Sequence, residues 1–280
     1  MFVIPNLFRD NKPGRGALSR IKSAMTILWV GQQMNMTGMT SLHPGYRGVI
    51  IGAGGGIGSA MAARLAGDPT CGTLHCVSRS GDAGPDAAIR HAADLTDATS
   101  LARAAAAIGA DGPIDLIFIA SGLLHRGAAV QPEKSWKAID ADAFATLFAV
   151  NATGPMLALQ ALLPHVPRDR RTLIGVIGAR VGSIGDNRLG GWYGYRASKA
   201  ALAMLLRTLS IELARTHPQL AALMLHPGTV DTALSEPFQR GVTKLLTPDE
   251  SAGAMLGVLN AATPEQSGQQ RDWQGELVAP

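Results

Sequence analysis

A glycine-rich turn between a strand-like and a helix-like segment constrains this chain more than any other feature. Residues 48–51 form a short apolar, β-branched run typical of a buried strand, and residues 59–66 are rich in helix formers. Between them lies Gly52-Ala-Gly-Gly-Gly-Ile-Gly58. In this order, free backbone N–H groups and the positive end of the helix dipole can receive a pyrophosphate. The turn therefore predicts a nucleotide-binding α/β fold.

The glycines follow a G-x-x-x-G-x-G spacing through Gly52, Gly56 and Gly58, although Gly54 also allows another count. This spacing differs from the G-x-G-x-x-G of ordinary dinucleotide-binding folds. We expect all four glycines, together with Ile57, to line the cofactor site.

Strand-like and helix-like segments alternate along the rest of the chain. Continuous apolar strands separated by helices indicate a parallel sheet covered on both faces. The sequence therefore predicts one doubly wound Rossmann-type domain over residues 46–280. The expected strands are 48–52, 73–78, 89–93, 114–119, 171–177, 220–226 and, more weakly, 275–278. The expected helices are 57–66, 97–108, 140–149, 152–164, 195–215 and 248–261.

Residues with polar or turn-forming character come directly after six of these strands. Because the carboxyl ends of parallel strands meet at one edge of the sheet, we expect them to form a single site there. They are Gly52, Ser78-Arg79, Asp94, Ala120-Ser121-Gly122, Ala179 and Pro227-Gly228.

Tyr195 and Lys199 begin a long helix-like stretch and are four residues apart, so they share one helix face. A free phenol has a pKa near ~10, too high for efficient proton exchange at neutral pH. A neighbouring ammonium lowers the pKa of a phenol. The pair therefore predicts an acid–base tyrosine assisted by a lysine.

With these blocks in this order, the chain resembles the short-chain dehydrogenase/reductase family from about residue 48 to residue 278. The resemblance includes Asp94-Leu95, Ala120-Ser121-Gly122, Asn151 in Val-Asn-Ala-Thr-Gly, and Pro227-Gly228-Thr-Val-Asp-Thr232. Further segments, among them Pro132-Glu-Lys134 and Gly190-Gly-Trp192, resemble the branch that includes the bacterial C-factor cell-signalling proteins.

The resemblance implies a role for each matching residue. Tyr195 would exchange the proton, and Lys199 would hold the nicotinamide ribose and lower the tyrosine pKa. Asn151, whose amide must be satisfied inside an apolar helix, would kink that helix or anchor a water of the proton relay. Asp94 and Leu95 would contact adenine. Pro227, Gly228 and Val230 would face the nicotinamide, with Thr232 near the phosphates.

The end of the second expected strand indicates which cofactor is used. NAD-binding members of the family place an acid there, whereas this chain has Ser78-Arg79. An arginine can pair with a 2′-phosphate. We therefore expect NADP, with NAD as the alternative.

The chain departs from the family pattern at the substrate serine. Ala179 stands at the end of the fifth expected strand, where the family has a serine that binds the substrate oxygen. Ser183 lies twelve residues before Tyr195 and either turns inward to replace it or is an ordinary loop residue. The fourth-strand turn also lacks the family's asparagines.

We therefore expect an oxidoreductase that acts on a small carbonyl or secondary alcohol. The alternative is a cofactor-binding regulatory protein of the C-factor type with little turnover. Apolar outer faces expected for the helices over 151–164 and 195–215 predict a homodimer or homotetramer.

Composition limits the remaining classes. Hydrophobic residues make up 46% of the 280 residues and charged residues 16%, so the core can be large. Six of the 25 basic residues but only one of the 21 acidic residues lie within residues 1–48, so the rest is nearly neutral. This distribution argues against a nucleic-acid partner despite the net charge of +4.

Residues 1–45 are expected to form a basic leader outside the domain. A disordered tail, a transit peptide or a mis-assigned start all fit its composition. No apolar run reaches the ~18 residues of a membrane helix, so we expect no membrane partner. Cys71 and Cys76 have neither metal nor disulfide spacing. We expect a cytoplasmic protein without metal, with organellar import through the leader as the alternative.

Overall fold

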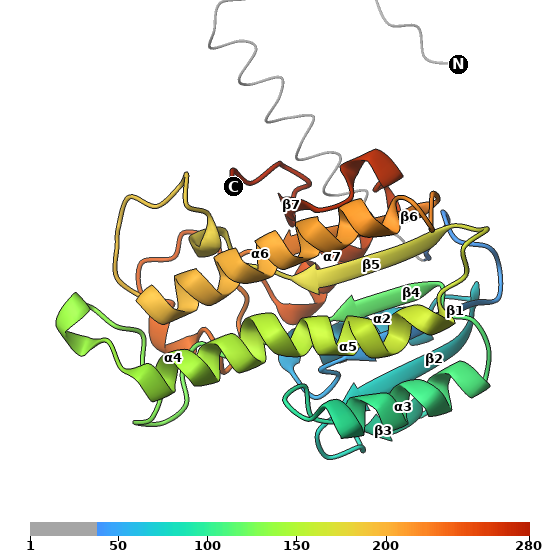
Figure 1. Ribbon diagram of the computed structural model, residues 1–280, viewed down its shortest axis with the longest axis horizontal. Coiled ribbons are helices and arrows are strands. Elements are labelled where there is room, and N and C mark those ends of the chain that lie inside the picture. The colour runs from blue at the N-terminus through green and yellow to red at the C-terminus, as the bar shows by residue number, and fades with distance from the viewer. Residues whose placement is uncertain (1–37) are drawn as a thin grey trace, which may run out of the picture.

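Seven parallel strands form one sheet through the middle of the protein (Figure 1). The computed structural model describes residues 38–280. The strand order is β3-β2-β1-β4-β5-β6-β7, which reverses direction between β1 and β4 and confirms the predicted doubly wound fold. The strands are β1 Tyr46–Ile51, β2 Cys71–Ser78, β3 Ile89–Ala92, β4 Leu116–Ile119, β5 Thr172–Ile177, β6 Leu220–His226 and β7 Gln269–Asp272.

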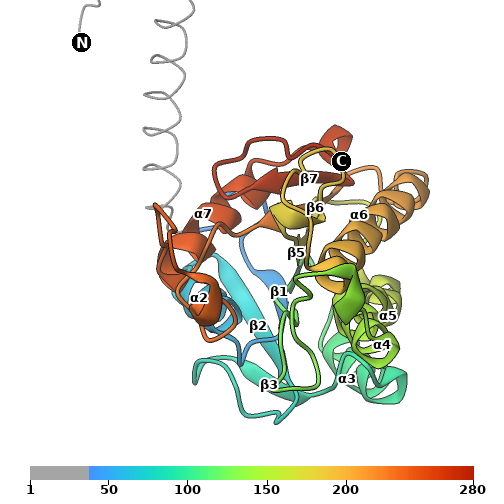
Figure 2. The same ribbon diagram turned by 90° about the vertical axis from the view of Figure 1, so that its left-hand side faces the viewer.

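Helices cover both faces of this sheet, as Figure 2 shows end-on. On one face lie α2 and α7, and on the other lie α3, α4, α5 and α6. The bounds are α2 Gly56–Ala66, α3 Ala98–Ala110, α4 Ala141–Phe148, α5 Gly154–Leu162, α6 Tyr193–Leu213 and α7 Pro248–Asn260. Asp97 caps α3 by accepting a hydrogen bond from the Thr99 N–H.

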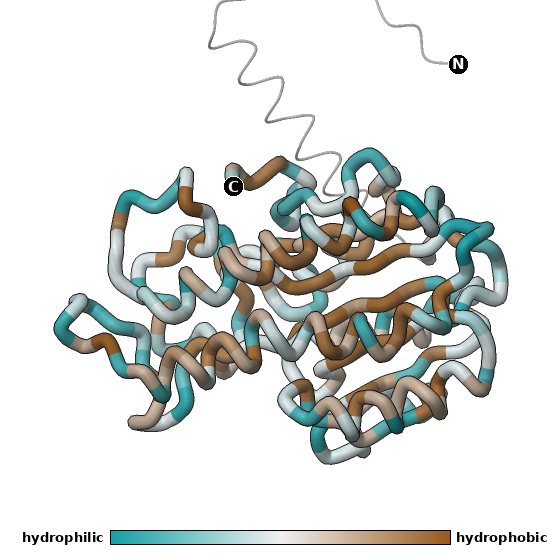
Figure 3. Tube along the Cα trace, viewed as in Figure 1, coloured by the Kyte–Doolittle hydropathy of each residue, from teal (hydrophilic) through white to brown (hydrophobic). Residues whose placement is uncertain are grey.

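The core consists of two apolar layers, one on each face of the sheet. Successive strand residues point to opposite faces, so Val49 and Ile51 pack towards α3 while Ile50 packs towards α2 and α7. Figure 3 shows the central strands as the most hydrophobic segments, with hydrophilic residues in the connecting turns. Burial on both faces explains why the inner strands read as continuous apolar runs.

The seventh strand lies earlier in the chain than the sequence predicts. It is Gln269–Asp272, whereas the expected segment 275–278 turns back and contributes only an antiparallel bridge between Leu277 and Arg271. A polar strand is stable here because it lies at the sheet edge and exposes one side.

Residues 38–45, which the sequence assigns to the leader, pack on the domain. Met39 and Leu42 are buried in the layer around α2 and α7. The Asp68 carboxylate accepts hydrogen bonds from the Met39 N–H and the Tyr46 hydroxyl, both at 2.8 Å. Ser41 N–H donates to the Asn260 side chain on α7 at 2.9 Å. The expected leader up to residue 37 lies outside the described residues.

The helical run Ala141–His165 is longer than any apolar segment expected from the sequence. By length and composition it could cross a membrane, with a mean hydropathy of 1.4 in its most apolar window. Here it serves as a covering layer, since α5 packs against α3 and α4 packs against α6. Its middle, Ala149–Thr153, is a π-helical turn.

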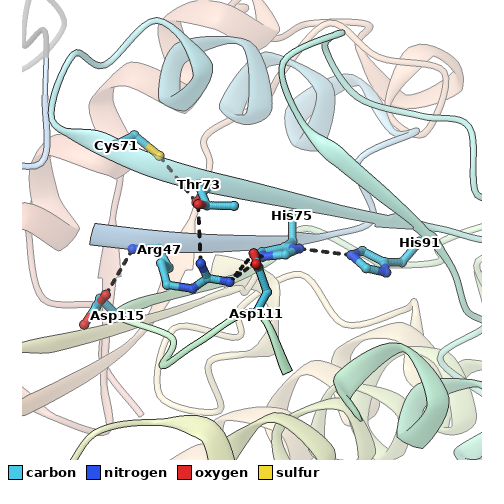
Figure 4. A network of polar contacts seen from close by, with 7 residues as sticks. All are labelled: Arg47, Cys71, Thr73, His75, His91, Asp111 and Asp115. Atoms are coloured by element: carbon cyan, nitrogen blue, oxygen red, sulfur yellow. Dashed lines mark hydrogen bonds and ion pairs between the residues drawn. The ribbon is translucent and has the colours of Figure 1, made fainter. Parts of the chain in front are cut away.

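A buried polar network lies on β1 and β2, away from the carboxyl ends of the strands (Figure 4). The His75 ring nitrogens lie 3.0 Å from Arg47 Nη2 and 3.0 Å from His91 Nε2. Arg47 also pairs with Asp111 at the end of α3 at 2.5 Å. Burial, followed by the charges of His91 and Arg47, lowers the pKa of His75 to about 4. Burial also lowers the pKa of His91, so both histidines are neutral at neutral pH, and Asp111 balances the charge of Arg47.

Candidate functional site

The glycine turn forms a cradle that side chains would fill. Gly52 follows β1 with φ +87°, and a Cβ there would lie 2.5 Å from Ser121 Oγ. A Cβ on Gly58 would lie 2.2 Å from the Gly52 carbonyl oxygen, so helix and turn touch through bare backbone. A Cβ on Gly56 would lie 2.8 Å from Thr232 Cγ2, which brings the later loop to this turn.

The N-terminus of α2 has no side-chain cap and no acidic residue in its first turn. Its first N–H groups and dipole are therefore available to an anion such as a pyrophosphate. The cradle fits the expected dinucleotide. Gly54, in contrast, has ordinary contacts, with Ala83 Cβ at 3.5 Å from a built Cβ, and Ile57 is half-buried against the α2 and α7 layer.

At the end of β2 the two expected residues have different roles. Ser78 is buried, and its hydroxyl accepts a hydrogen bond from the Gly81 N–H at 3.0 Å, so it holds the turn. Arg79 is exposed. The Asp94 carboxylate accepts hydrogen bonds from Thr96, which lower its pKa, and the charges of Arg79 and Arg126 act in the same direction. Arg79 therefore lies in the electrostatic range of Asp94, as the prediction of one adenosine site requires.

Leu95 lies in the apolar core. Its side chain is buried in the α3 and α5 layer, where its Cβ would be 2.9 Å from a Cβ on Gly154. The contact of Leu95 with adenine stays a prediction. Glycine at position 154 allows α5 to approach Leu95 this closely.

Asn151 links the turn after β4 to α6 from within the π-helical turn. Its Oδ1 accepts from the Leu123 N–H and its Nδ2 donates to the Leu123 carbonyl, both at 2.7 Å. Nδ2 also lies 3.1 Å from the Ser198 hydroxyl. The amide is thus satisfied at both ends, and the irregular helix geometry expected for it is observed.

The turn Ala120-Ser121-Gly122 brings the two halves of the site together. Ser121 borders Gly52 in the cradle, and Ala120 Cβ lies 3.2 Å from a Cβ built on Gly58. A Cβ on Gly122 would lie 3.5 Å from Lys199 Nζ and 3.6 Å from Asn151 Oδ1. The glycine cradle, the asparagine and the lysine therefore converge on one turn.

Tyr195 and Lys199 lie on the buried face of the first turns of α6. Lys199 Nζ donates to the Ile177 carbonyl at 3.0 Å and lies 6.0 Å from the centre of the Tyr195 ring. Burial lowers the pKa of Lys199 to about 8 and raises the pKa of Tyr195 to about 12. The direction for Tyr195 is opposite to the lowering expected from the lysine, because burial outweighs the ammonium. At neutral pH the site therefore holds a protonated phenol beside an ammonium.

The start of α6 depends on a residue that the sequence did not identify. Trp192 precedes the helix with φ +53° and provides no side-chain cap. Glu133 takes the place of a side-chain cap. Its backbone carbonyl accepts a hydrogen bond from the Trp192 N–H at 2.6 Å. Its carboxylate oxygens accept from the Gly194 N–H at 3.2 and 3.3 Å. Glu133 is buried at 4% exposure and so fixes the first turn of α6, which begins two residues before Tyr195. Glu133 belongs to the segment Pro132-Glu-Lys134, but no local sequence pattern predicts its hydrogen bonds to the start of α6.

The hydroxyl of the candidate serine is engaged by its own loop and by the chain end. Ala179 follows β5 and packs in one apolar cluster with Tyr195, Leu124 and Leu147. Ser183 is buried, but its hydroxyl accepts from the Asp186 N–H at 3.0 Å and donates weakly to the Pro280 carbonyl at 3.5 Å. The inward-turned Ser183 is therefore not observed, because the hydroxyl is held by its own loop and the chain end.

The segment after β6 contacts α7 and Leu246, and it reaches the cradle through Thr232. Gly228 has φ +79°, and a Cβ there would lie 2.9 Å from Leu246 Cδ1. The Pro227 carbonyl accepts from the Ser251 hydroxyl at 2.8 Å, and Val230 pairs with Leu246. Thr232 borders Gly56, as expected for a residue near the phosphates.

A strip of aromatic rings leads from Tyr195 to the turn after β4. The Trp192 ring stands edge-on to Tyr195 at 6.2 Å and to Phe238 at 5.0 Å between centroids. Phe238 in turn stands edge-on to His125 at 5.7 Å. This strip therefore begins at Tyr195 and ends at His125.

The sequence of this chain is similar to a known family and to individual proteins. The family model described as short chain dehydrogenase matches residues 48–242. The C-signal protein of Myxococcus xanthus is 33% identical over 168 residues, which span 60% of this chain and 93% of that protein. The 1-hydroxy-2-glutathionyl-2-methyl-3-butene dehydrogenase of a Rhodococcus species is 30% identical over 176 residues, 62% of this chain and 73% of that protein.

Solved structures share the fold over most of the chain. A putative short-chain dehydrogenase/reductase from Burkholderia multivorans with bound NADP is 29% identical, with a TM-score of 0.70, and covers 85% of this chain and 100% of its own. The NADPH-bound carbonyl reductase from chicken fatty liver has a TM-score of 0.74 at 23% identity, covering 89% of this chain and 98% of its own.

Proposed function

The chain belongs to the short-chain dehydrogenase/reductase family and is an NAD(P)-dependent oxidoreductase, and from that premise we propose how its own residues act. NADP is the favoured cofactor and a carbonyl or secondary alcohol is the substrate. The observation that carries the proposal is the convergence of Tyr195, Lys199 and Asn151 on the turn that also closes the glycine cradle.

The cofactor would be held by the cradle and the exposed arginine. Gly52, Gly56 and Gly58 leave room for the pyrophosphate at the N-terminus of α2, with Thr232 beside it. Arg79 would pair with a 2′-phosphate, and a relative that is 29% identical has NADP bound. When bound, the nicotinamide supplies a hydride.

Tyr195 is the proposed proton donor. Because burial raises its pKa to about 12, the phenol carries its proton at neutral pH and donates it to the substrate oxygen. The Lys199 ammonium stabilises the negative charge that develops on the phenol oxygen. Its bond to the Ile177 carbonyl fixes its position before the ribose hydroxyls are engaged. Asn151 orients the turn after β4 and stands beside Lys199 at the head of the proton relay.

The regulatory alternative is less well supported. A protein that only binds cofactor has no need for a buried phenol and a buried ammonium on one helix face, since burial of an ammonium is unfavourable. The chain is 33% identical to the C-signal protein and 30% identical to a dehydrogenase, so sequence identity does not favour the regulatory alternative.

We further propose that copies of this chain self-associate in the cytoplasm. Met204 and Ile211 on α6 are 67% and 50% exposed, and Leu205 is 37% exposed. Such an apolar helix face favours burial against a second copy of the same face. Cys71 and Cys76 are free thiols, which fits a reducing compartment.

The proposed function is tested by binding first and turnover second. NADPH fluorescence titration gives the dissociation constant, and benzaldehyde, acetophenone, hexanal and cyclohexanone then form the carbonyl panel. Tyr195→Phe removes only the phenol oxygen, so NADPH affinity should stay within about 2-fold while kcat falls by on the order of 10³-fold. Lys199→Ala should weaken both.

Bound NADPH without turnover on any carbonyl of the panel would refute the proposed activity. Full turnover in Tyr195→Phe would refute the assignment of the proton donor while leaving the activity intact. The two failures are therefore separable in one set of measurements.

A further inference from the structure

The substrate oxygen needs a second hydrogen-bond donor besides Tyr195, and the expected serine does not supply it. Ala179 occupies the strand-end position in the Tyr195 cluster without a hydroxyl. The Ser183 hydroxyl is engaged with Asp186 and Pro280. In an apolar cluster, a carbonyl oxygen with a single donor would leave the developing charge poorly stabilised.

His125 presents a nitrogen that has no partner. Its Nε2 is buried and makes no hydrogen bond to the residues that the structure describes. An unsatisfied buried polar group destabilises a protein by about 1–3 kcal/mol, so native structures rarely retain one without a use. The other such atoms within residues 38–280 are Ser41 Oγ, Arg47 Nε, Thr172 Oγ1 and His226 Nδ1.

A series of packing contacts connects His125 to the Tyr195 end of the site. Its neighbour Leu124 lies in the same buried cluster as Tyr195 and Ala179. The aromatic strip through Phe238 and Trp192 connects the His125 ring to the Tyr195 ring. Of the other atoms without partners, those of Arg47 and Thr172 belong to the starts of β1 and β5, at the opposite edge of the sheet.

Phe238 indicates how the nitrogen becomes available. It lies in the 3₁₀ turn Glu236–Phe238 between β6 and α7 and stands edge-on to the His125 ring. A substrate that entered beside Tyr195 and displaced this aromatic contact would meet the His125 ring in its place. The strip of rings also favours a flat or aromatic group on the substrate.

We propose that His125 donates, through Nε2–H, the hydrogen bond to the substrate oxygen that Ala179 cannot supply. This inference rests on the proposed function. In reduction the His125 Nε2–H donates to the carbonyl oxygen while Tyr195 transfers its proton. The imidazole remains a donor to the alcohol oxygen in the product and exchanges no proton itself.

The test compares variants that keep or lose the donor. His125→Gln retains an N–H near the Nε2 position, whereas His125→Leu retains only apolar volume. Thr172→Val is the matched control, because it also deletes a buried polar atom without a partner but at the far edge of the sheet. Ala179→Ser in the His125→Leu background restores a hydroxyl to the strand end.

We expect kcat on the best carbonyl of the panel to fall by on the order of 10²-fold in His125→Leu. His125→Gln should retain a larger share, Thr172→Val should match the wild type, and the added serine should recover part of the loss. NADPH affinity should be unchanged in all four. By calorimetry, His125→Leu should bind the same carbonyl on the order of 10-fold more weakly in its complex with NADP⁺.

Equal kcat in His125→Leu and wild type would overturn the inference. Equal losses in the Gln and Leu variants would also overturn it, because they would assign His125 a packing role. Thermal unfolding of each variant separates a loss of fold from a loss of the donor. An inactive wild type with bound NADPH would instead remove the proposed function, and this inference with it.

Discussion

Replacement of Gly58 by alanine should break the cradle without touching any reacting group. The new Cβ would lie 2.2 Å from the Gly52 carbonyl oxygen, 2.9 Å from the Gly52 carbonyl carbon and 3.2 Å from Ala120 Cβ. An ordinary contact begins at 3.4 Å, so the turn and α2 must separate by about 1 Å. The obstacle is backbone, which cannot rotate away as a side chain can.

The magnitude follows from two opposing effects. Overpacking of this kind destabilises by about 1–3 kcal/mol, and the higher helix propensity of alanine returns up to about 1 kcal/mol. A net loss of about 1–2 kcal/mol lowers Tm by about 2–8 °C in a domain of this size. Loss of two charge-assisted hydrogen bonds to the pyrophosphate, at about 1.5 kcal/mol each, weakens NADPH by about 10²-fold.

Fluorescence titration and thermal unfolding measure both quantities, and Gly54→Ala provides the control. The nearest atoms to a Cβ on Gly54 are Ala83 Cβ at 3.5 Å and Ser78 Cβ at 3.9 Å, which are ordinary contacts. We expect its Tm to match the wild type and its NADPH affinity to change several-fold at most. Wild-type affinity and Tm in Gly58→Ala, or equal effects of both substitutions, would show that the close approach is not what the cradle requires.

Three further outcomes are expected. Arg79→Ala should weaken NADPH by about 10-fold or more and leave NADH unchanged in fluorescence titrations, since only NADPH has the 2′-phosphate; equal effects on both would exclude this role. Light scattering should give a multiple of the 29.1 kDa chain mass at micromolar concentration, and Met204→Glu with Ile211→Glu should reduce it to one chain. The pKa of His75 is about 4 in the folded state and 6.5 in the unfolded chain, so the stability present above about pH 6.5 is lost as the pH falls towards about 4. His75→Gln should reduce the fall in Tm between about pH 7 and about pH 5, and an unchanged fall would place the acid sensitivity elsewhere, such as His91 or His226.

Elements determined by local pattern were predictable, and elements determined by packing were not. The glycine turn and the inner strands follow from β-branched runs and from a turn that only glycine permits. The seventh strand is Gln-Gln-Arg-Asp, whose polar residues resemble a loop because one side of an edge strand is exposed. Residues 38–45 carry no periodic pattern, yet Asp68 and Asn260 hold them through hydrogen bonds across long sequence separations.

In the candidate site, too, features set by local spacing were predictable and features set by packing were not. Spacing alone places Tyr195 and Lys199 on one face, and both are where the sequence predicts them. The sequence cannot reveal that burial exceeds the effect of the ammonium on the Tyr195 pKa, because burial depends on the whole of the surrounding fold. Ser183 has a plausible spacing from Tyr195, but Asp186 and Pro280 determine the direction of its hydroxyl.

The position of Tyr195 depends on a strained residue that is held by a residue distant in the sequence. A tryptophan at φ +53° is unfavourable by about 1–3 kcal/mol and persists only where its surroundings enforce it. Glu133 enforces it by binding the Trp192 and Gly194 N–H groups, which no local side chain caps. The same conformation turns the Trp192 ring onto Tyr195 and Phe238. One backbone distortion thus starts the helix that carries Tyr195 and Lys199 and also sets the Trp192 ring against Tyr195 and Phe238.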